Sequence, residues 1–252
     1  MIPNSQKSNF FYLSSWIFLI VVFLGFAPSF YLKFLVEEQP FYPKGLPLPY
    51  IIHGMILTIW YVFLVVQTRL VKTKNLKIHK KSGYFGALWA ILVLVSTFYA
   101  ISLFPDRMES LAAELGQTVS EIEPGLSSIL WLDILMSLFF VSCLALGIQY
   151  RTNPKIHKRL MFFTGLAYLF AASSRVGGTA AHLMDSNLGH LIGPFLLLGL
   201  SGGLLVHDYR VFGKVLPLSW ILFVVYWILM VISQIVGAAE WGEDFVFFLF
   251  KS

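Results

Sequence analysis

The seven residues Asn75–Lys81, Asn-Leu-Lys-Ile-His-Lys-Lys, recur at Asn153–Arg159 as Asn-Pro-Lys-Ile-His-Lys-Arg. Each copy follows one long apolar segment and opens the next, which predicts a repeated helix–loop–helix unit with a basic, histidine-bearing elbow. The elbow residues of interest are His79, Lys80, Lys81, His157, Lys158 and Arg159. The repeat predicts architecture and orientation, and it does not indicate a reaction.

The composition of the whole chain is that of a membrane protein. Of the 252 residues, 58% are hydrophobic and only 12% are charged, and the mean hydropathy is +0.77, whereas soluble domains carry about 25% charged residues. We therefore expect an all-α polytopic bundle that forms a single transmembrane domain over residues 1–252. Seven apolar segments are long enough to cross a hydrocarbon core of about 30 Å: residues 10–35, 49–70, 82–104, 125–148, 158–176, 188–206 and 217–238.

The distribution of cations predicts the orientation. Twelve of the 18 Lys and Arg residues fall in three alternate loops: Arg69, Lys72, Lys74, Lys77, Lys80, Lys81, Arg151, Lys155, Lys158, Arg159, Arg210 and Lys214. The positive-inside rule places these loops in the cytoplasm, with the amino terminus inside and the carboxyl terminus outside a bacterial inner membrane. Their expected partners are the bilayer and its anionic lipids at the cytoplasmic face, and no nucleic-acid-binding motif is present.

The longest outer loop has a pattern of its own. Between residues 106 and 123, apolar side chains recur every three or four positions among acidic ones, which predicts a short amphipathic helix on the outer surface: Met108, Leu111, Leu115, Val119 and Ile122. The segment is either a lid over an outer opening or a connector whose apolar side rests on the bundle or on the headgroups.

Five predicted helices carry a polar residue at similar depth in the outer third of the bundle, and these residues are His53, Asp133, Arg175, His190 and Gln234. Charged groups in hydrocarbon cost several kcal/mol unless they face the interior or a partner, so we expect Asp133 and Arg175 to pair. The pair either pins two helices together or takes part in function. In the functional case, Arg175 receives an anionic group, or Asp133 orients or deprotonates a histidine.

The histidines divide between the two sides, with His53, His182 and His190 outside and the remaining three at inner helix ends. His53 and His190 together would serve as axial ligands of a b-type haem, and the outer trio offers a metal site. We expect the inner histidines to be interfacial side chains beside lysines; the alternative is that they are metal or haem ligands. The single Cys143 excludes an intrachain disulfide, no nucleophile motif is present, and Gly199, Gly202 and Gly203 predict a helix-packing face.

Several of these residues together resemble a group of uncharacterised bacterial seven-helix membrane proteins. The resemblance rests on His53-Gly54, a span ending in Gln67, the elbow His79-Lys80-Lys81-Ser82-Gly83, the elbow His157–Met161 followed by Arg175, and Asp208-Tyr209-Arg210. Where members of the group have His-Arg-Arg-Leu-Gly, this chain keeps the charge but has Lys80, Lys81 and Ser82. The resemblance implies the seven-helix topology and a role for His53 and Arg175. One elbow is also similar to small membrane proteins that assist haem-copper oxidase assembly.

Three functions follow as expectations from these observations. The first is an outer-leaflet pocket for a small or lipid-like ligand, with transport as one use of it. The second is a haem- or metal-binding redox or assembly protein that uses His53 and His190, and the third is a structural or assembly partner without a ligand. No enzyme class is indicated.

Overall fold

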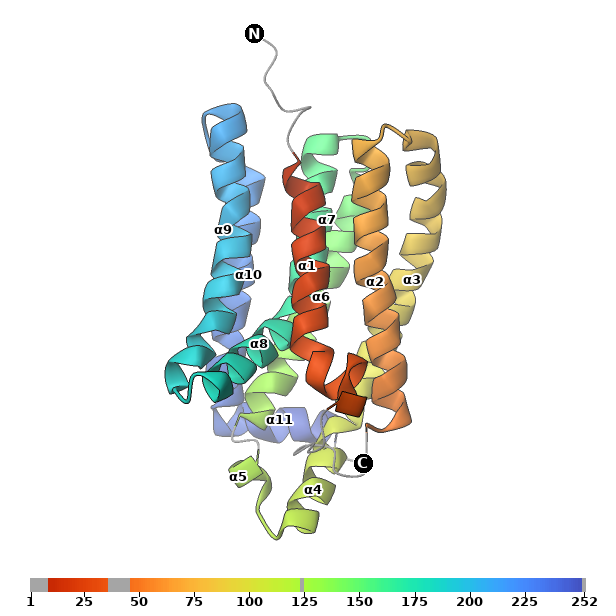
Figure 1. Cartoon of the computed structure of the whole chain (residues 1–252). Helices are drawn as coiled ribbons and strands as arrows, with labels where there is room; N and C mark the ends of the chain where they lie inside the picture. Colours follow the sequence, from red (N-terminus) through yellow and green to blue (C-terminus); the bar gives the residue numbers. More distant parts are fainter. Residues whose placement is uncertain (1–8, 36–45, 123–124, 251–252) are drawn as a thin grey trace.

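The computed structural model describes residues 9–35, 46–122 and 125–250, and every regular element within these ranges is a helix. The helices run side by side as a bundle, with shorter helices gathered at one end (Figure 1). Their bounds are α1 Phe10–Phe26, a π-helix Ala27–Tyr31, a 3-10 helix Lys33–Leu35, α2 Leu48–Lys72, α3 Leu76–Ser102, α4 Phe104–Leu115, α5 Val119–Ile122, α6 Leu126–Gln149, α7 Pro154–Ala167, α8 Leu169–Leu183, a 3-10 helix η4 Asn187–Leu191, α9 Ile192–Phe212, α10 Pro217–Gly237 and α11 Glu240–Phe250.

The prediction of an all-helical chain with several helices of membrane-spanning length is confirmed. Among the described residues, six helices or helix runs are long and apolar enough to cross a membrane: Phe10–Tyr31, Leu48–Lys72, Leu76–Leu115, Leu126–Gln149, Asn187–Phe212 and Pro217–Gly237. The pair α7 and α8 passes the same test together but is bent by 48°, so it adds a seventh span if it is counted as one. Many large apolar side chains, such as Leu24 and Phe195, are exposed on the bundle surface, as expected where lipid replaces water.

The break between α7 and α8 interrupts the helix predicted over 158–176. It falls at Tyr168, where no proline accounts for it. Two backbone carbonyls beside the break accept hydrogen bonds from tyrosines of other helices: Tyr61 Oη donates to the Gly165 carbonyl at 2.9 Å, and Tyr226 Oη donates to that of Leu166 at 3.4 Å. An irregular backbone inside a membrane protein persists only where freed polar groups find such partners.

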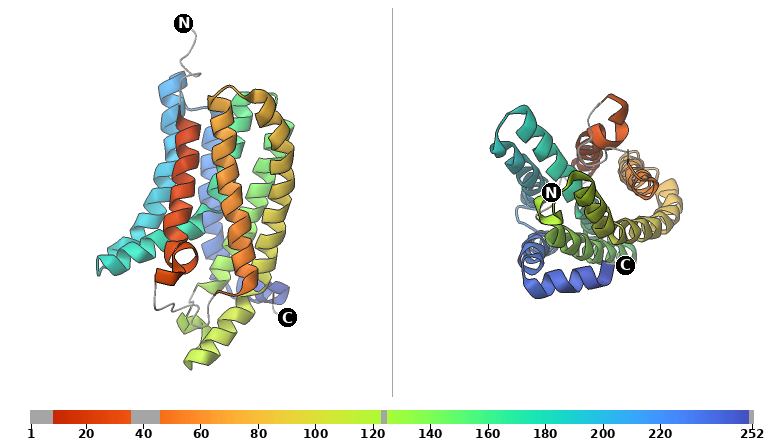
Figure 2. Two further views of the ribbon diagram at one scale, coloured as in Figure 1. Left: turned by 45° about the vertical axis from the view of Figure 1, so that its right-hand side comes forward. Right: turned by 90° about the horizontal axis from the view of Figure 1, so that it is seen from below.

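Several other helix boundaries differ from the predicted ones by one helical turn or more. The elbow residues belong to helices, because α3 begins at Leu76 and α7 at Pro154, so only a tight turn through Lys74, at φ 62°, separates α2 from α3. The helix predicted over 10–35 stops being α-helical at Phe26, before Pro28. Helix α11 was not expected, and it lies across the end of the bundle (Figure 2). The acidic residues Glu37, Glu38 and Glu123 lie outside the described residues.

The core runs through the middle of the bundle, and a smaller cluster holds the amphipathic segment. In the core, Phe18, Phe140 and Phe163 are among the side chains that are almost fully buried. At the end of the bundle that carries α4 and α11, Met108 and Leu111 of α4 are buried in a second cluster with Leu130 of α6 and Val246 of α11. The apolar side of α4 thus rests on the bundle, as in the connector interpretation, while Leu115 at its end is exposed.

Candidate functional site

The structure separates His53 from the rest of the predicted pocket. His53 Nδ1 forms a hydrogen bond of 3.2 Å with Ser96 Oγ, which ties α2 to α3. Helix α2 and helix α8, which leads into η4, lie on opposite sides of α1 (Figure 1), and His190 lines a hollow with residues of α8 and η4 and with none of α2. The predicted use of these two histidines as axial ligands of one haem therefore has no geometric support.

Asp133 and Arg175 approach each other without forming a contact ion pair. In the part of the chain that the structure describes, no Asp133–Arg175 salt bridge within 4 Å is formed. The guanidinium of Arg175 lies over the ring of Phe26, 4.6 Å from its centroid, and Nη1 donates a hydrogen bond of 3.2 Å to the Ala171 carbonyl. The direct ion pair predicted from the sequence is therefore not formed between these two residues.

Asp133 lies beside the break in the fifth predicted span. Ser137, one helical turn further along α6, accepts a hydrogen bond of 2.9 Å from Oη of Tyr168, the residue at the break. We call Asp133, Ser137 and Tyr168 the polar seam. Asp133 itself is half-buried, whereas Ser137 and Tyr168 are buried.

At the end of the bundle opposite the elbows, which the sequence predicts to be the outer end, α8 and the helix η4 border an open hollow of about 480 Å³, which we call the outer hollow. Two predicted site residues, His182 and His190, share this hollow, and the remaining lining is small or polar: Gly178, Ala181, Asp185, Ser186 and Asn187. Across the described ranges, no group of three or more His, Cys, Asp or Glu residues is placed to hold a metal ion. The metal trio predicted from the sequence is not assembled, because His53 lies elsewhere.

Glycines hold the walls of the outer hollow together. A Cβ on Gly189 would lie 2.1 Å from the backbone nitrogen of Ala181, and one on Gly177 would lie 3.1 Å from the His190 carbonyl oxygen. No side chain fits in the first position, so η4 packs directly on the backbone of α8. This contact fixes the two histidines relative to each other.

Arg175 belongs to the same face of α8 as the hollow. Arg175, Gly178 and His182 follow one another at three- and four-residue spacing, which places them on one side of a helix. The path along α8 from the outer hollow to the break at Tyr168 passes Arg175, whose exposed side chain does not itself line the hollow. Imidazole, carboxylate, hydroxyl and guanidinium groups along this path can bind a polar ligand with an anionic group, because Arg recognises carboxylates and phosphates in particular.

Gln234 does not contribute to this arrangement. Its side chain is exposed on α10, and Nε2 donates a hydrogen bond of 3.3 Å to Ser233 Oγ. It neither lines the outer hollow nor joins the polar seam. Gln234 was predicted to line the pocket only because of its depth along the helix, and depth does not determine the direction in which a side chain points.

At the opposite end of the bundle, the two elbows of the repeat touch each other through equivalent residues. The rings of His79 and His157 lie edge to face, with centroids 6.2 Å apart, and His157 Nδ1 is hydrogen-bonded to the Gly147 carbonyl at 2.8 Å. Lys158 lies over the ring of Phe11, 4.8 Å from its centroid. The exposed Lys80 and Lys81 remain available to solvent or lipid.

Arg159 does not lie with the exposed elbow cations, contrary to the prediction from the repeat. Its side chain is 0% exposed and forms a buried salt bridge with Asp208 of α9. Arg159 Nε donates to Asp208 Oδ2 at 3.1 Å and to Ser219 Oγ of α10 at 2.8 Å, while Nη1 donates to the Lys155 carbonyl at 2.6 Å. Ser219 Oγ in turn donates to Asp208 Oδ2 at 2.5 Å. This cluster joins three helices.

A signal for this cluster was present in the sequence. Asp208 is the one acidic residue close to the three basic loops, and it lies two residues beyond the span predicted over 188–206. A buried carboxylate there needs a cation, and the elbow supplies several. The sequence does not show which cation turns inward.

No protein-family model, curated protein or solved structure matches the chain.

Proposed function

We propose that the chain is a bacterial inner-membrane protein with seven spans, in which α7 and α8 together form a bent fifth span. The support is the charge distribution: the basic loops lie at one end of the bundle, whereas Asp106, Glu109, Glu114 and Asp185 lie at the other. By the positive-inside rule the basic end and the amino terminus are cytoplasmic. Reporter fusions after Lys74 and Lys155 should report the cytoplasm and a fusion at Glu114 the exterior, and the reverse pattern would overturn the orientation.

We further propose that the outer half binds a small or lipid-like ligand with an anionic group, and that transport is one use of this site. The observation that carries the proposal is the break at Tyr168, from which α8 leads past Arg175 to the outer hollow. Binding sites of membrane transporters typically lie where a helix is discontinuous, because the interrupted backbone and nearby polar groups can face a ligand there.

Each group has a proposed role in holding the ligand. Arg175 receives the anionic group, and its contact with Phe26 keeps the guanidinium on the ligand side of α8. His182 and His190 contribute hydrogen bonds from the rim, and Asp185 accepts hydrogen bonds from hydroxyl or amine groups of the ligand. Asp133 lies deeper, beside the break, where it is suited to a second, cationic species or a proton.

A thermal-shift screen of the purified protein tests the proposal. The probes are dicarboxylates, inorganic phosphate and lysophosphatidylglycerol, because they carry anionic groups on molecules of different size and polarity. A compound present at about 100 times its Kd stabilises the folded state by roughly 2.7 kcal/mol. We expect at least one probe to stabilise the wild type and to lose this effect in Arg175→Gln and His190→Ala.

The matched control is Arg151→Gln, which removes an exposed cation at the opposite end of the bundle. It should respond to the probe as the wild type does. Stabilisation that survives in Arg175→Gln and His190→Ala, or the absence of any stabilising probe, would contradict the proposal and favour a structural or assembly role. A Soret band in the purified protein would instead favour the haem interpretation.

A further inference from the structure

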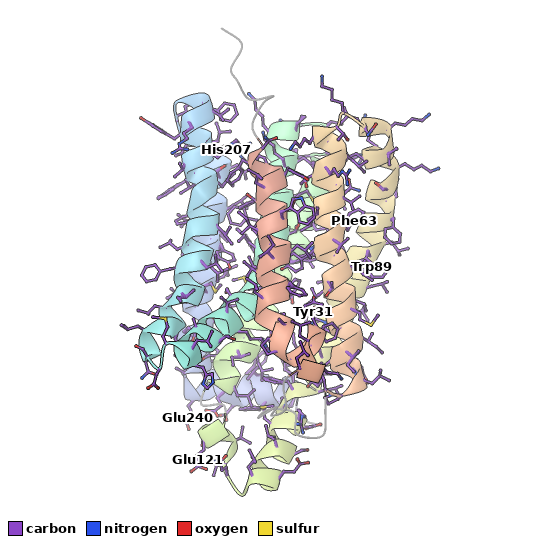
Figure 3. The ribbon with its side chains drawn as sticks, in the orientation of Figure 1. Tyr31, Phe63, Trp89, Glu121, His207 and Glu240 are labelled. Carbon is purple, nitrogen blue, oxygen red and sulfur yellow. The ribbon has the colours of Figure 1, made fainter. Side chains whose placement is uncertain are left out.

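A second hollow lies on the cytoplasmic half of the bundle, between α9 and the start of α1. We call it the inner groove. It has a volume of about 690 Å³, and its lining is mainly apolar. The residues that matter for the argument are Phe10, Gly199, Gly202, Gly203, His207 and Arg210. The side chain of His207 lies between α9 and α1 near the end of the bundle (Figure 3).

Three glycines leave this groove open. A Cβ on Gly199 would have no protein atom within 4 Å, one on Gly202 would lie 4.0 Å from a Phe223 carbon, and one on Gly203 would lie 3.7 Å from a Phe10 carbon. Glycines that mediate helix packing are in much closer contact, such as Gly25, whose Cβ would lie 2.3 Å from the Ala172 carbonyl oxygen. Among the described residues, only the ring edges of Phe10 and Phe223 come within 4 Å of a Cβ placed on these glycines, so no helix packs closely on this face of α9, and it forms the floor of a recess.

The inner end of the groove is closed by aromatic rings and carries positive charge. His207 stacks on Phe10 with ring centroids 4.6 Å apart, and Phe11 packs against the same imidazole at 5.4 Å. Arg210 is exposed at the end of the groove. The nearby Asp208 does not neutralise it, because that carboxylate is buried against Arg159.

We infer that the inner groove binds an anionic phospholipid, with an acyl chain along the glycine face and the phosphate at Arg210. The groove extends along α9 from Leu198 to Arg210, a rise of about 18 Å, which is close to the roughly 15 Å depth of one leaflet. Its apolar floor ends in a cation at the depth of the headgroups. The inference rests on the proposed orientation and is independent of the outer ligand.

Charge distinguishes this occupant from a second copy of the chain. Gly199 and Gly203 form a Gly-x-x-x-Gly pattern, which in other membrane helices mediates dimers. A symmetric dimer through α9 would bring Arg210 of each copy toward the other, where like charges repel. An anionic lipid gains from the same charge, so the lipid is the better fit.

Native mass spectrometry of the delipidated full chain tests the inference. The probes are phosphatidylglycerol and phosphatidylcholine with identical acyl chains, added in mild detergent. We expect one phosphatidylglycerol to bind in preference to phosphatidylcholine. One cation near the membrane surface contributes about 1 kcal/mol, so Arg210→Gln should weaken phosphatidylglycerol binding about fivefold. Lys214→Gln is the matched control, because Lys214 lies in the same loop region but does not line the groove.

Two further variants fill the groove. Gly199→Leu and Gly203→Leu should remove the bound phosphatidylglycerol, whereas Gly83→Leu, at another glycine with open space around it, should not. If Gly203→Leu does not fold, Gly199→Leu decides, because a Cβ at that position has no protein atom of the described residues within 4 Å. Equal lipid binding by Arg210→Gln and the wild type, or lipid retained by both groove-filling variants, would overturn the inference. Conversion of a dimer to a monomer with lipid binding unchanged would also overturn it, in favour of a second copy.

Discussion

Removing either partner of the buried salt bridge between Arg159 and Asp208 should be among the most destabilising single substitutions in the bundle. Both side chains are fully buried, and Ser219 hydrogen-bonds to both of them. Removing one partner, as in Arg159→Met or Asp208→Leu, leaves the other charge in a low-dielectric interior and should reduce the free energy of unfolding by about 3 to 5 kcal/mol. Ser219→Ala removes only a neutral partner of the charged groups and should cost about 1.5 to 3 kcal/mol.

The double variant Arg159→Met/Asp208→Leu distinguishes a coupled pair from two independent contributions. Replacing both charges by apolar side chains leaves no unpaired charge, so its loss should be much smaller than the sum of the single losses. The assay is equilibrium unfolding in mixed micelles with increasing dodecyl sulfate, followed by tryptophan fluorescence. Additive losses, or single variants within about 0.5 kcal/mol of the wild type, would refute the assignment of Arg159 as a buried partner.

Three further predictions concern the packing around the break and the outer half. Tyr61→Phe removes the hydroxyl that donates to the Gly165 carbonyl at the break, and it should destabilise the bundle by about 1 to 3 kcal/mol in the same unfolding assay. An effect near zero would mean that the break does not need this hydrogen bond. Gly25→Ala adds a methyl group against the backbone of α8 and should cost about 1 to 3 kcal/mol through overpacking, and a neutral result would contradict the close contact of α1 with α8. A double-mutant cycle on Asp133 and Arg175 should give a coupling well below that of the buried salt bridge, because the two do not form a contact pair, and a coupling above about 3 kcal/mol would mean that they do.

Membrane architecture could be predicted because it depends on simple properties of the chain. Apolar segments of spanning length and alternate basic loops are visible without any knowledge of packing. The all-helical class and the approximate positions of the spans therefore agree with the structure. The break at Tyr168 was not predicted, because the residues around it include no proline, and the donors that satisfy the freed carbonyls come from Tyr61 and Tyr226 on distant helices.

The candidate site was predicted less well, for a geometric reason. Distance along a helix gives the depth of a residue, whereas the direction of its side chain depends on how the helices pack around one another. His53, His190 and Gln234 have similar depths but point to different neighbours. The position of Arg159 depends on tertiary packing in the same way, since its partner Asp208 lies on another helix.

The accessibility of His182 tests the central claim, that the outer half of α8 presents a binding site to the exterior. In a Cys143→Ser background, which removes the single native thiol, His182→Cys places a reactive thiol in the outer hollow. The measurement is labelling of this variant in intact spheroplasts by a membrane-impermeant maleimide. We predict labelling without permeabilisation. Labelling only after permeabilisation, or none at all in the folded protein, would contradict the account.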